Sequence, residues 1–185
     1  MAKDYIPTEE DVLRVQSRGF YQRSFPWRKG YHRFIHVDIQ SRLATKFLPA
    51  FESATTIIFC VNLADYDQGG KPNRLAQSIH HFDWIVNLPC FERFGTSIFL
   101  LLTNANTFQD KLASSPFAKH FPTFCGENDA GQTEQYITRQ FREANRAKLD
   151  MRFHKTQSVT LLDIQHMLKW IHGSVVSINL TNALS

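Results

Sequence analysis

Two apolar runs of strand length constrain the fold of this chain more than any other feature of its sequence. The runs Thr55–Leu63 and Ser97–Leu102 carry no charged residue, and the first is rich in β-branched side chains. Continuous apolar runs of this length are typical of strands that are buried on both faces of a parallel sheet. Between them, Asn73–Asn87 has apolar side chains at helical spacing. The order strand, helix, strand therefore predicts an α/β fold.

Further segments after the second run continue this alternation. Thr133–Lys148 has apolar residues at helical spacing and predicts a long helix, and Met151–His154 predicts a short last strand. Ser158 is a candidate cap for a final helix that extends to Val175. Because ligands of α/β sheets bind at the carboxyl ends of the strands, the loops that follow strands are candidate sites. These loops are Asp65–Lys71, Thr103–Asn106 and Lys155–Gln157.

The segment before residue 55 has a different character. It is rich in aromatic residues, and a turn signal at Lys29-Gly30 predicts a hairpin of the strands Phe20–Trp27 and Tyr31–Val37. Between residues 14 and 46 there are eight basic residues and one acid, whereas the whole chain has a net charge of +4. A segment this basic favours an anionic partner. Nucleotide, nucleic acid, an acidic protein, a membrane surface and a merely solvated face all remain open.

Composition narrows the class of protein. A length of 185 residues suits one domain, and a hydrophobic fraction of 43% supports a packed core. No run approaches the roughly 20 apolar residues of a membrane helix, and the N-terminus has neither a signal-peptide apolar region nor a Met-Gly acylation start. The three cysteines form no C-x-x-C pair, so neither a disulfide framework nor a zinc site is predicted. We expect a cytoplasmic protein without a membrane span or lipid anchor.

Several short motifs follow one another in an order that has a known counterpart. Asp4-Tyr5-Ile6-Pro7-Thr8 precedes the basic segment, Phe59-Cys60-Val61 lies in the first apolar run, and Ala64-Asp65-Tyr66-Asp67-Gln68 follows it. In this order the motifs resemble the C-terminal, Ras-like half of heterotrimeric G-protein alpha subunits. The resemblance implies a truncated Ras-like α/β fold of three layers that lacks the first strand. Its mixed sheet would have about five strands, with helices on both faces.

The resemblance also defines which parts of that family are missing. A family member has a first strand, a G-x-x-x-x-G-K-[ST] phosphate loop and an all-helical domain, and the 185 residues contain no such motif. Residues 1–185 then correspond to one partial Ras-like domain: a lead-in at 1–13, degenerate switch regions at 14–52 and an α/β body at 53–185. The family's ligands are GTP, GDP and Mg²⁺. We expect their binding to be weak or lost without the phosphate loop.

In the first switch region, Leu13 and Arg14 match nucleotide-binding positions of the family. Gln16 stands where the family has a catalytic arginine, which contributes about 10³–10⁵ in rate by stabilising transition-state charge. A neutral glutamine cannot supply that charge. The family's magnesium-binding threonine falls on Ser17 if two residues are deleted before it, so Ser17 is the metal-ligating candidate.

In the second switch region, the family has Asp-x-Gly-Gly-Gln and this chain has Asp38-Ile39-Gln40. Asp38 matches a nucleotide-binding position, and Gln40 matches the catalytic glutamine that positions the attacking water. Both glycines, which let the backbone approach the terminal phosphate, are absent. We therefore expect Gln40 to be non-functional in catalysis. Asp38 and Gln40 also fit ordinary residues at a strand end.

The family's base-recognition sequence Asn-Lys-Lys-Asp is matched by Thr103, Asn104, Ala105 and Asn106. The family's aspartate accepts two N–H bonds from guanine, whereas the amide of Asn106 would place its own donor against another donor. Losing a charge-assisted hydrogen bond costs about 1.5–3 kcal/mol. The last nucleotide-binding loop is matched by Lys155 and Thr156. Lys155 puts a long cation where the family has a small residue.

These concerted changes predict a regulatory or partner-binding module of heterotrimeric G-protein signalling with impaired nucleotide binding. The resemblance places the chain among GTPases and leaves its activity open. By resemblance, the partners are the beta-gamma dimer, an effector or a receptor, bound through Gln40–Phe51 and Leu161–Leu184. Such partners would recruit the protein to the inner face of the plasma membrane. One alternative is a functional GTPase with an atypical phosphate site, and a less favoured one is nucleic-acid binding through residues 18–33.

The missing first strand has a structural consequence. In the family that strand lies inside the sheet, so its absence leaves inner strand edges without a partner, and unpaired buried backbone is costly. Two solutions are open. The predicted strand Tyr31–Val37 pairs directly with Thr55–Leu63, or strands are exchanged within a homodimer.

Overall fold

The computed structural model describes residues 20–27, 30–37, 48–51, 54–94 and 96–157, together with residues 165, 168, 169, 172 and 173. The chain divides into two compact units, residues 1–50 and 51–185. In the first unit, β1 (Phe20–Trp27) and β2 (Gly30–Val37) pair antiparallel, with Phe20 opposite Val37. The predicted hairpin is confirmed.

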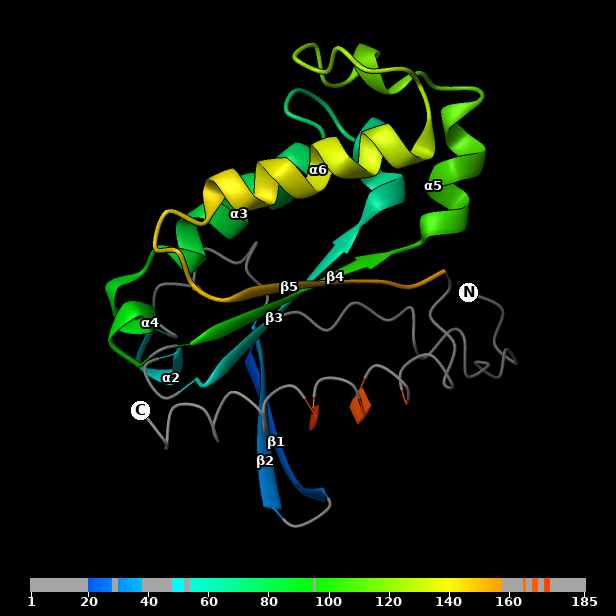
Figure 1. The fold of residues 1–185 in the computed structure, drawn as a ribbon. Coiled ribbons are helices and arrows are strands. Elements are labelled where there is room, and N and C mark those ends of the chain that lie inside the picture. The colour runs from blue at the N-terminus through cyan, green and yellow to red at the C-terminus, as the bar shows by residue number, and fades with distance from the viewer. Residues whose placement is uncertain are drawn as a thin grey trace, which may run out of the picture. The chain divides into compact units, whose positions relative to one another are not determined.

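The second unit contains a parallel sheet of three strands in the order β3 (Thr56–Asn62), β4 (Ser97–Thr103) and β5 (Met151–Lys155) (Figure 1). A short helix, α2 (Leu48–Phe51), precedes β3. Each parallel connection is a helical crossover, because parallel neighbours cannot be joined by a tight turn. The two strands predicted from the apolar runs, and the last strand predicted at Met151–His154, are confirmed.

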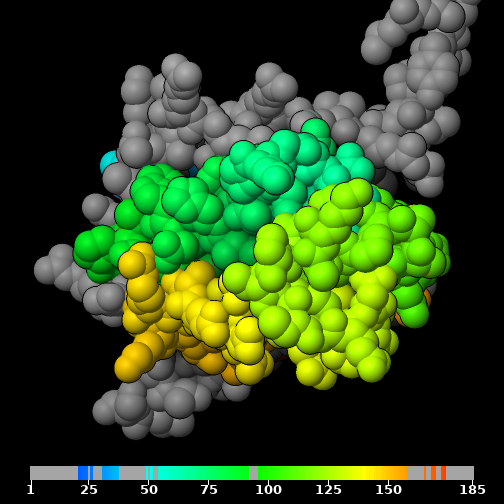
Figure 2. All heavy atoms as spheres, turned by 90° about the horizontal axis from the view of Figure 1, so that it is seen from above, coloured from blue at the N-terminus to red at the C-terminus, as the bar shows by residue number. Residues whose placement is uncertain are grey.

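The first crossover holds the 3-10 turn η2 (Leu63–Asp67) and the helices α3 (Arg74–Val86) and α4 (Pro89–Phe94). The second holds α5 (Ala105–Leu112), the 3-10 turn η3 (Phe117–Lys119) and α6 (Ala130–Ala144). Figure 2 shows these crossovers from above as one continuous surface of side chains, coloured from teal to yellow.

Side-chain caps determine where the two long helices begin. The Asn73 side chain accepts a hydrogen bond from Ala76 N at 2.8 Å, which starts α3 where the sequence predicts it. Asp129 caps α6 by accepting from Gln132 N at 3.0 Å, so α6 begins before the predicted Thr133. It also ends earlier than predicted, at Ala144, because the chain turns at Asn145.

Helices α3 and α6 cover the same face of the sheet (Figure 1). The Phe59 ring of β3 lies 5.2 Å from the Phe82 ring of α3 and 6.3 Å from the Phe141 ring of α6. The central strand is buried on both faces, and none of its residues from Ile98 to Leu101 is more than 1% exposed. Burial of this apolar area stabilises the fold by about 25 cal/mol for each Å².

A second aromatic cluster lies beneath the loops at the carboxyl end of the sheet. Phe117 stacks on Phe121 with ring centroids 4.5 Å apart, and it also contacts Tyr66 at 5.5 Å and Tyr136 at 5.8 Å. The buried Tyr66 hydroxyl donates to Ser115 O at 2.5 Å. The cluster fixes η2 against the second crossover, and thereby the loop that follows β3.

The five described strands run in mixed directions, as expected, but they form two sheets rather than one. Among the described strands, β2 pairs with β1 and β3 pairs with β4, so the direct pairing of Tyr31–Val37 with Thr55–Leu63 does not occur between them. The described helices α3 and α6 cover one face, and most of the predicted final helix lies outside the described residues. Within the described part of the chain, no helix is long and apolar enough to span a membrane.

Candidate functional site

The carboxyl ends of the three parallel strands meet at one edge of the sheet. Asn62 pairs with Thr103 at the end of the β3–β4 ladder. Leu102 pairs with Lys155 at the end of the β4–β5 ladder. Polar side chains from three separate segments therefore come together where α/β sheets bind their ligands.

Asn62 is the centre of a hydrogen-bond network at this edge. Its Oδ1 atom accepts from Ala64 N at 3.1 Å and from Asn104 Nδ2 at 3.0 Å. Its Nδ2 atom donates to Asp65 Oδ1 at 3.0 Å. Asn104 has left-handed backbone angles (φ 57°, ψ 39°), which asparagine tolerates better than most residues. The side-chain amide of Asn104 is therefore directed back into the protein.

The other two polar residues of the base-recognition match differ in availability. Thr103 donates its hydroxyl proton to Val61 O at 3.2 Å. Asn106 lies in the first turn of α5 and is exposed, and its side chain makes no hydrogen bond to another described residue. The amide of Asn106 is therefore the group of this loop that can meet a ligand.

Lys111 ties α5 to the loop after β3. Its Nζ atom donates to Ala64 O at 2.7 Å and forms an ion pair with the Asp67 carboxylate. Burial by itself would raise the pKa of Asp67, but hydrogen bonds from Lys111 and Gln68 and the Lys111 charge outweigh it and lower that pKa. Asp67 is therefore held in its ionised form.

The neighbouring Asp65 has the opposite shift. Burial raises the pKa of Asp65, and the charges of Arg74 and Lys111 only partly oppose this, while Asp67 adds to it. The two carboxylates of the loop thus differ in environment although they are two residues apart. Within the described residues, no group of three or more His, Cys, Asp and Glu side chains is arranged to hold a metal ion.

The loop after β5 is connected to its surroundings on both sides. Thr156 N donates to Leu102 O at 2.9 Å, and Thr156 O accepts from Ala105 N at 3.4 Å. The Nζ atom of Lys155 lies 3.0 Å from Glu134 Oε2 on α6. The structure thus brings Thr103, Asn104, Asn106, Lys155 and Thr156 to the same edge of the sheet.

The remaining sequence candidates lie outside the described residues: Leu13, Arg14, Gln16, Ser17, Asp38 and Gln40. Three residues of the edge are not among the sequence-predicted candidates, namely Asn62, Lys111 and Glu134. Asn62 could have been found from the sequence, because it is a polar residue next to the end of an apolar run. Lys111 and Glu134 could not have been found from the sequence, since their partners lie 44 and 21 residues away in it.

The side chain of Asn106 is an amide rather than a carboxylate. Guanine presents two adjacent N–H donors, which a carboxylate satisfies and a single amide oxygen does not. Asn106 supplies only that amide, and Asn104 is bonded to Asn62. The edge offers hydrogen-bond partners to a small polar ligand, and its carboxylates, Asp65 and Asp67, lie on the loop after β3.

A family model described as G-protein alpha subunit matches residues 1–175 of the chain. Curated relatives cover nearly the whole chain. The guanine nucleotide-binding protein alpha-3 subunit of Neurospora crassa is 35% identical over 100% of this chain and 52% of its own length. The alpha-3 subunit of Mycosarcoma maydis is 34% identical over 98% of this chain and 51% of its own length.

A relative from an animal is similar to the same extent. The guanine nucleotide-binding protein G(o) subunit alpha of Locusta migratoria is 32% identical over 97% of this chain and 52% of its own length. The chain therefore spans about half the length of the curated relatives it matches.

Proposed function

Because the chain belongs to the G-protein alpha subunit family, we propose that it is a partner-binding protein of G-protein signalling with an impaired guanine-nucleotide site. The observation that carries the proposal is the contact between Asn104 Nδ2 and Asn62 Oδ1 at 3.0 Å. Asn104 stands where the family has a lysine in its base-recognition loop. The Asn104 side chain is shorter than a lysine, neutral and hydrogen-bonded to Asn62, so it cannot make the contact that the lysine makes in the family.

The substitution at Asn106 supports the same conclusion. An aspartate at this position would accept two N–H bonds from guanine. In an asparagine, the side-chain NH2 group would instead face one of these guanine N–H donors. A lost charge-assisted hydrogen bond of about 1.5–3 kcal/mol weakens affinity by roughly tenfold to more than a hundredfold. GTP and GDP should therefore bind weakly, with or without Mg²⁺.

Hydrolysis should be weaker still. Gln16 replaces the arginine that the family uses for transition-state charge, and Gln40 lacks the two glycines that precede the catalytic glutamine in the family. We therefore propose that any bound nucleotide is hydrolysed slowly. A functional GTPase with an atypical phosphate site is the alternative, and micromolar GTP binding to the wild type would favour it.

The proposed partners are those of heterotrimeric signalling: the beta-gamma dimer, an effector or a receptor. Binding to such partners would bring the protein to the inner face of the plasma membrane. Capture with purified beta-gamma dimer and with receptor cytoplasmic peptides tests the proposal. Failure to recover the protein with any of them would contradict it.

Self-association through strand pairing is a further part of the proposal. Among the described strands β3 pairs with β4 alone, and we propose that a second copy pairs with the other edge of β3. Sedimentation equilibrium over a wide range of protein concentrations tests this. A homodimer is expected, and a monomer at every concentration would rule it out.

The base-recognition change can be tested by restoring it. Asn106→Asp returns the carboxylate, and we expect guanine-nucleotide affinity to rise by about tenfold to a hundredfold. The affinity for xanthine nucleotides should instead be higher in the wild type than in Asn106→Asp, because xanthine has a carbonyl where guanine has an amino group. Gln109→Glu is a matched control that adds a negative charge to the exposed side of the same helix. Equal effects of the two variants would show that net charge, not base recognition, governs binding.

A second candidate function has one specific observation in its favour. The hairpin β1–β2 carries no acid, and it exposes Tyr31 at 85% and Tyr21 at 51% beside the exposed Arg23 and Arg33. Basic and aromatic side chains together bind single-stranded nucleic acid. Fluorescence anisotropy with a single-stranded oligonucleotide would then show affinity that falls steeply with salt and is reduced in Tyr31→Ala. Absence of binding at low salt would eliminate this candidate.

A further inference from the structure

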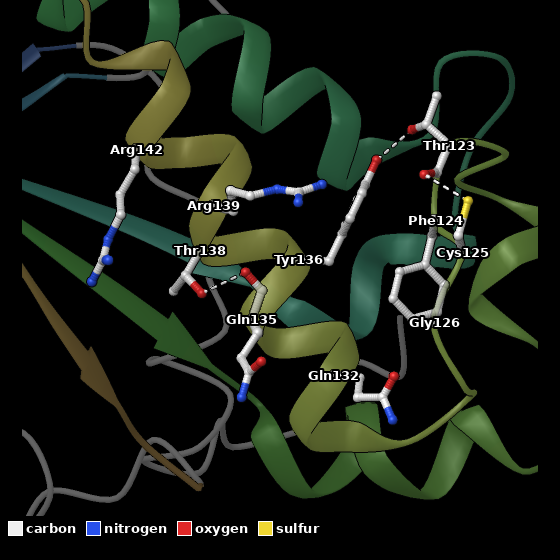
Figure 3. Close-up of a pocket in the computed structure, with 10 residues that line it drawn as sticks. All are labelled: Thr123, Phe124, Cys125, Gly126, Gln132, Gln135, Tyr136, Thr138, Arg139 and Arg142. Carbon is white, nitrogen blue, oxygen red and sulfur yellow. Dashed lines mark hydrogen bonds between the residues drawn. The ribbon is translucent and has the colours of Figure 1, made fainter.

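A groove lies along α6. It is lined by the loop of residues 123–126 and by α6, and it has a volume of about 800 Å³. Figure 3 shows its ten lining residues, with Phe124 and Tyr136 at one end and Arg142 at the other. Two of the ten are arginines, and none is an aspartate or glutamate.

The end of the groove nearest the loop has an aromatic floor. Phe124 and Tyr136 are 7% and 8% exposed, and their ring centroids are 5.3 Å apart in an edge-on arrangement. The Tyr136 hydroxyl is 2.6 Å from Thr123 Oγ1, which holds the loop against the helix. Gly126 leaves room for the Phe124 ring, since a Cβ atom at position 126 would lie 2.7 Å from that ring. The floor is therefore rigid and mostly apolar.

The other end of the groove carries one cation, Arg142, whereas Arg139 extends over the Tyr136 ring. Most cations of α6, β5 and the turn between them are ion-paired: Arg139 with Glu143 at 3.6 Å, Arg146 with Asp83 at 2.8 Å, Arg152 with Asp150 at 3.5 Å and Lys155 with Glu134 at 3.0 Å. Lys148 and Arg142 differ, because no described carboxylate forms an ion pair with either of them, and of the two only Arg142 lines the groove. The Arg142 guanidinium instead lies over the Phe153 ring, 4.8 Å from the centroid.

Stacking prepares Arg142 to receive a carboxylate. A guanidinium that lies over an aromatic ring keeps its N–H donors free at its edge, where a carboxylate can accept two parallel bonds. Arg139 extends over Tyr136, 5.6 Å from the ring centroid, and its ion pair is exposed by 63% and 61% at the two side chains. Exposed pairs of this kind contribute little, so Arg139 can exchange Glu143 for a partner's carboxylate.

We propose that this groove binds an acidic peptide segment of a partner protein, with an apolar side chain on the Phe124–Tyr136 floor and carboxylates at Arg139 and Arg142. The span from Gln132 to Arg142 is ten helical residues, or about 15 Å. An extended peptide covers that length with four to five residues. Glu127, which follows Gly126, is exposed at the aromatic end and directs the acidic residues toward Arg142.

Fluorescence anisotropy with the full chain tests this proposal. The probe is a labelled hexapeptide of one phenylalanine followed by glutamates, and its control replaces the glutamates with glutamines. We expect saturable binding of the acidic probe, and a loss of about tenfold or more in Arg142→Gln. Lys119→Gln is the matched control, because Lys119 is an exposed cation outside the groove, and it should bind like the wild type. Circular dichroism confirms that both variants are folded.

Three results would overturn the proposal. One is equal binding of the acidic and the glutamine probe, and another is equal weakening in Arg142→Gln and Lys119→Gln. The third is full displacement of the probe by a single-stranded oligonucleotide at a lower concentration than unlabelled acidic peptide, which would assign the cations to nucleic acid. The proposal does not depend on the nucleotide site, so a failure here leaves the proposed signalling function untouched.

Discussion

The side-chain amide of Asn104 donates a hydrogen bond to Asn62 Oδ1 at 3.0 Å, which links the ends of β4 and β3. Asn62 in turn bonds to Asp65 and caps η2 through Ala64 N. The Asn104 side chain therefore stabilises the protein's own loop structure. This contact is the reason that we expect a weak guanine site at an otherwise well-formed strand edge.

Removing the central asparagine should destabilise this edge. Asn62→Ala leaves the Asn104 amide and Ala64 N without their acceptor, and we expect a loss of about 1–3 kcal/mol in the free energy of unfolding. Urea denaturation followed by circular dichroism measures it. Asn106→Ala is the control, since the exposed Asn106 side chain makes no hydrogen bond to a described residue and should change stability by less than about 0.5 kcal/mol. A neutral effect of Asn62→Ala would show that the network does not hold the loop.

The contact of Lys111 with Asp67 predicts a pH-dependent contribution to stability. The lowered pKa of Asp67 means that its stabilising effect is present above the ordinary value of 3.8 and is lost as pH falls below it. Lys111→Met removes the hydrogen bond, so we expect the free energy of unfolding to fall by about 2 kcal/mol at neutral pH. Its further decrease toward acidic pH should be smaller than in the wild type. Denaturant midpoints measured from pH 7 to pH 3 test this. Lys119→Met, at an exposed position, should leave the profile unchanged.

His81 predicts a second pH dependence in a different range. Burial, and to a lesser degree the charge of His80, lower the pKa of His81 below 6.5. The unfolded chain then binds the proton more readily, so stability is fully present above about pH 6.5 and falls as pH drops below it. In His81→Gln, the denaturant midpoint should change less between pH 7.5 and 5.5 than it does in the wild type. His80→Gln should keep most of the slope, because burial is the larger cause.

Asn87 predicts a packing effect between the two long helices. Its Nδ2 atom donates to Ala144 O at 2.9 Å, and its Oδ1 atom accepts from Ala147 N at 2.9 Å, which joins the end of α3 to the end of α6. Asn87→Ala should cost about 1–3 kcal/mol and loosen the end of α6. Hydrogen exchange of the amide of Ala147 reports the local effect. Unchanged protection of that amide would show that the helices are held together by their apolar contacts alone.

Elements whose pattern is local were predictable from the sequence. Continuous apolar runs predict β3 and β4, turn residues predict the hairpin β1–β2, and apolar residues at helical spacing predict α3. The start of α6 was missed because Asp129 caps it ahead of the first apolar residue of the helical pattern. The division into two sheets could not be derived, because strand pairing depends on contacts between segments far apart in the sequence.

The candidate site shows the same limit. Thr103, Asn104 and Asn106 could be placed at the strand edge because they follow an apolar run directly. Their roles could not be derived, since Asn104 depends on Asn62, which lies 42 residues earlier. The ion pair of Lys155 with Glu134 is also a tertiary contact between β5 and α6. Sequence reasoning locates the edge, and the structure determines which of its side chains are free.

The impaired nucleotide site is the central claim, and a calorimetric titration of the wild-type protein tests it most directly. The ligand is a non-hydrolysable GTP analogue, with and without Mg²⁺, added to protein that circular dichroism shows to be folded. We expect no saturable heat up to millimolar ligand. Micromolar affinity would contradict the claim, and it would indicate that the basic residues between 14 and 46 supply a phosphate site.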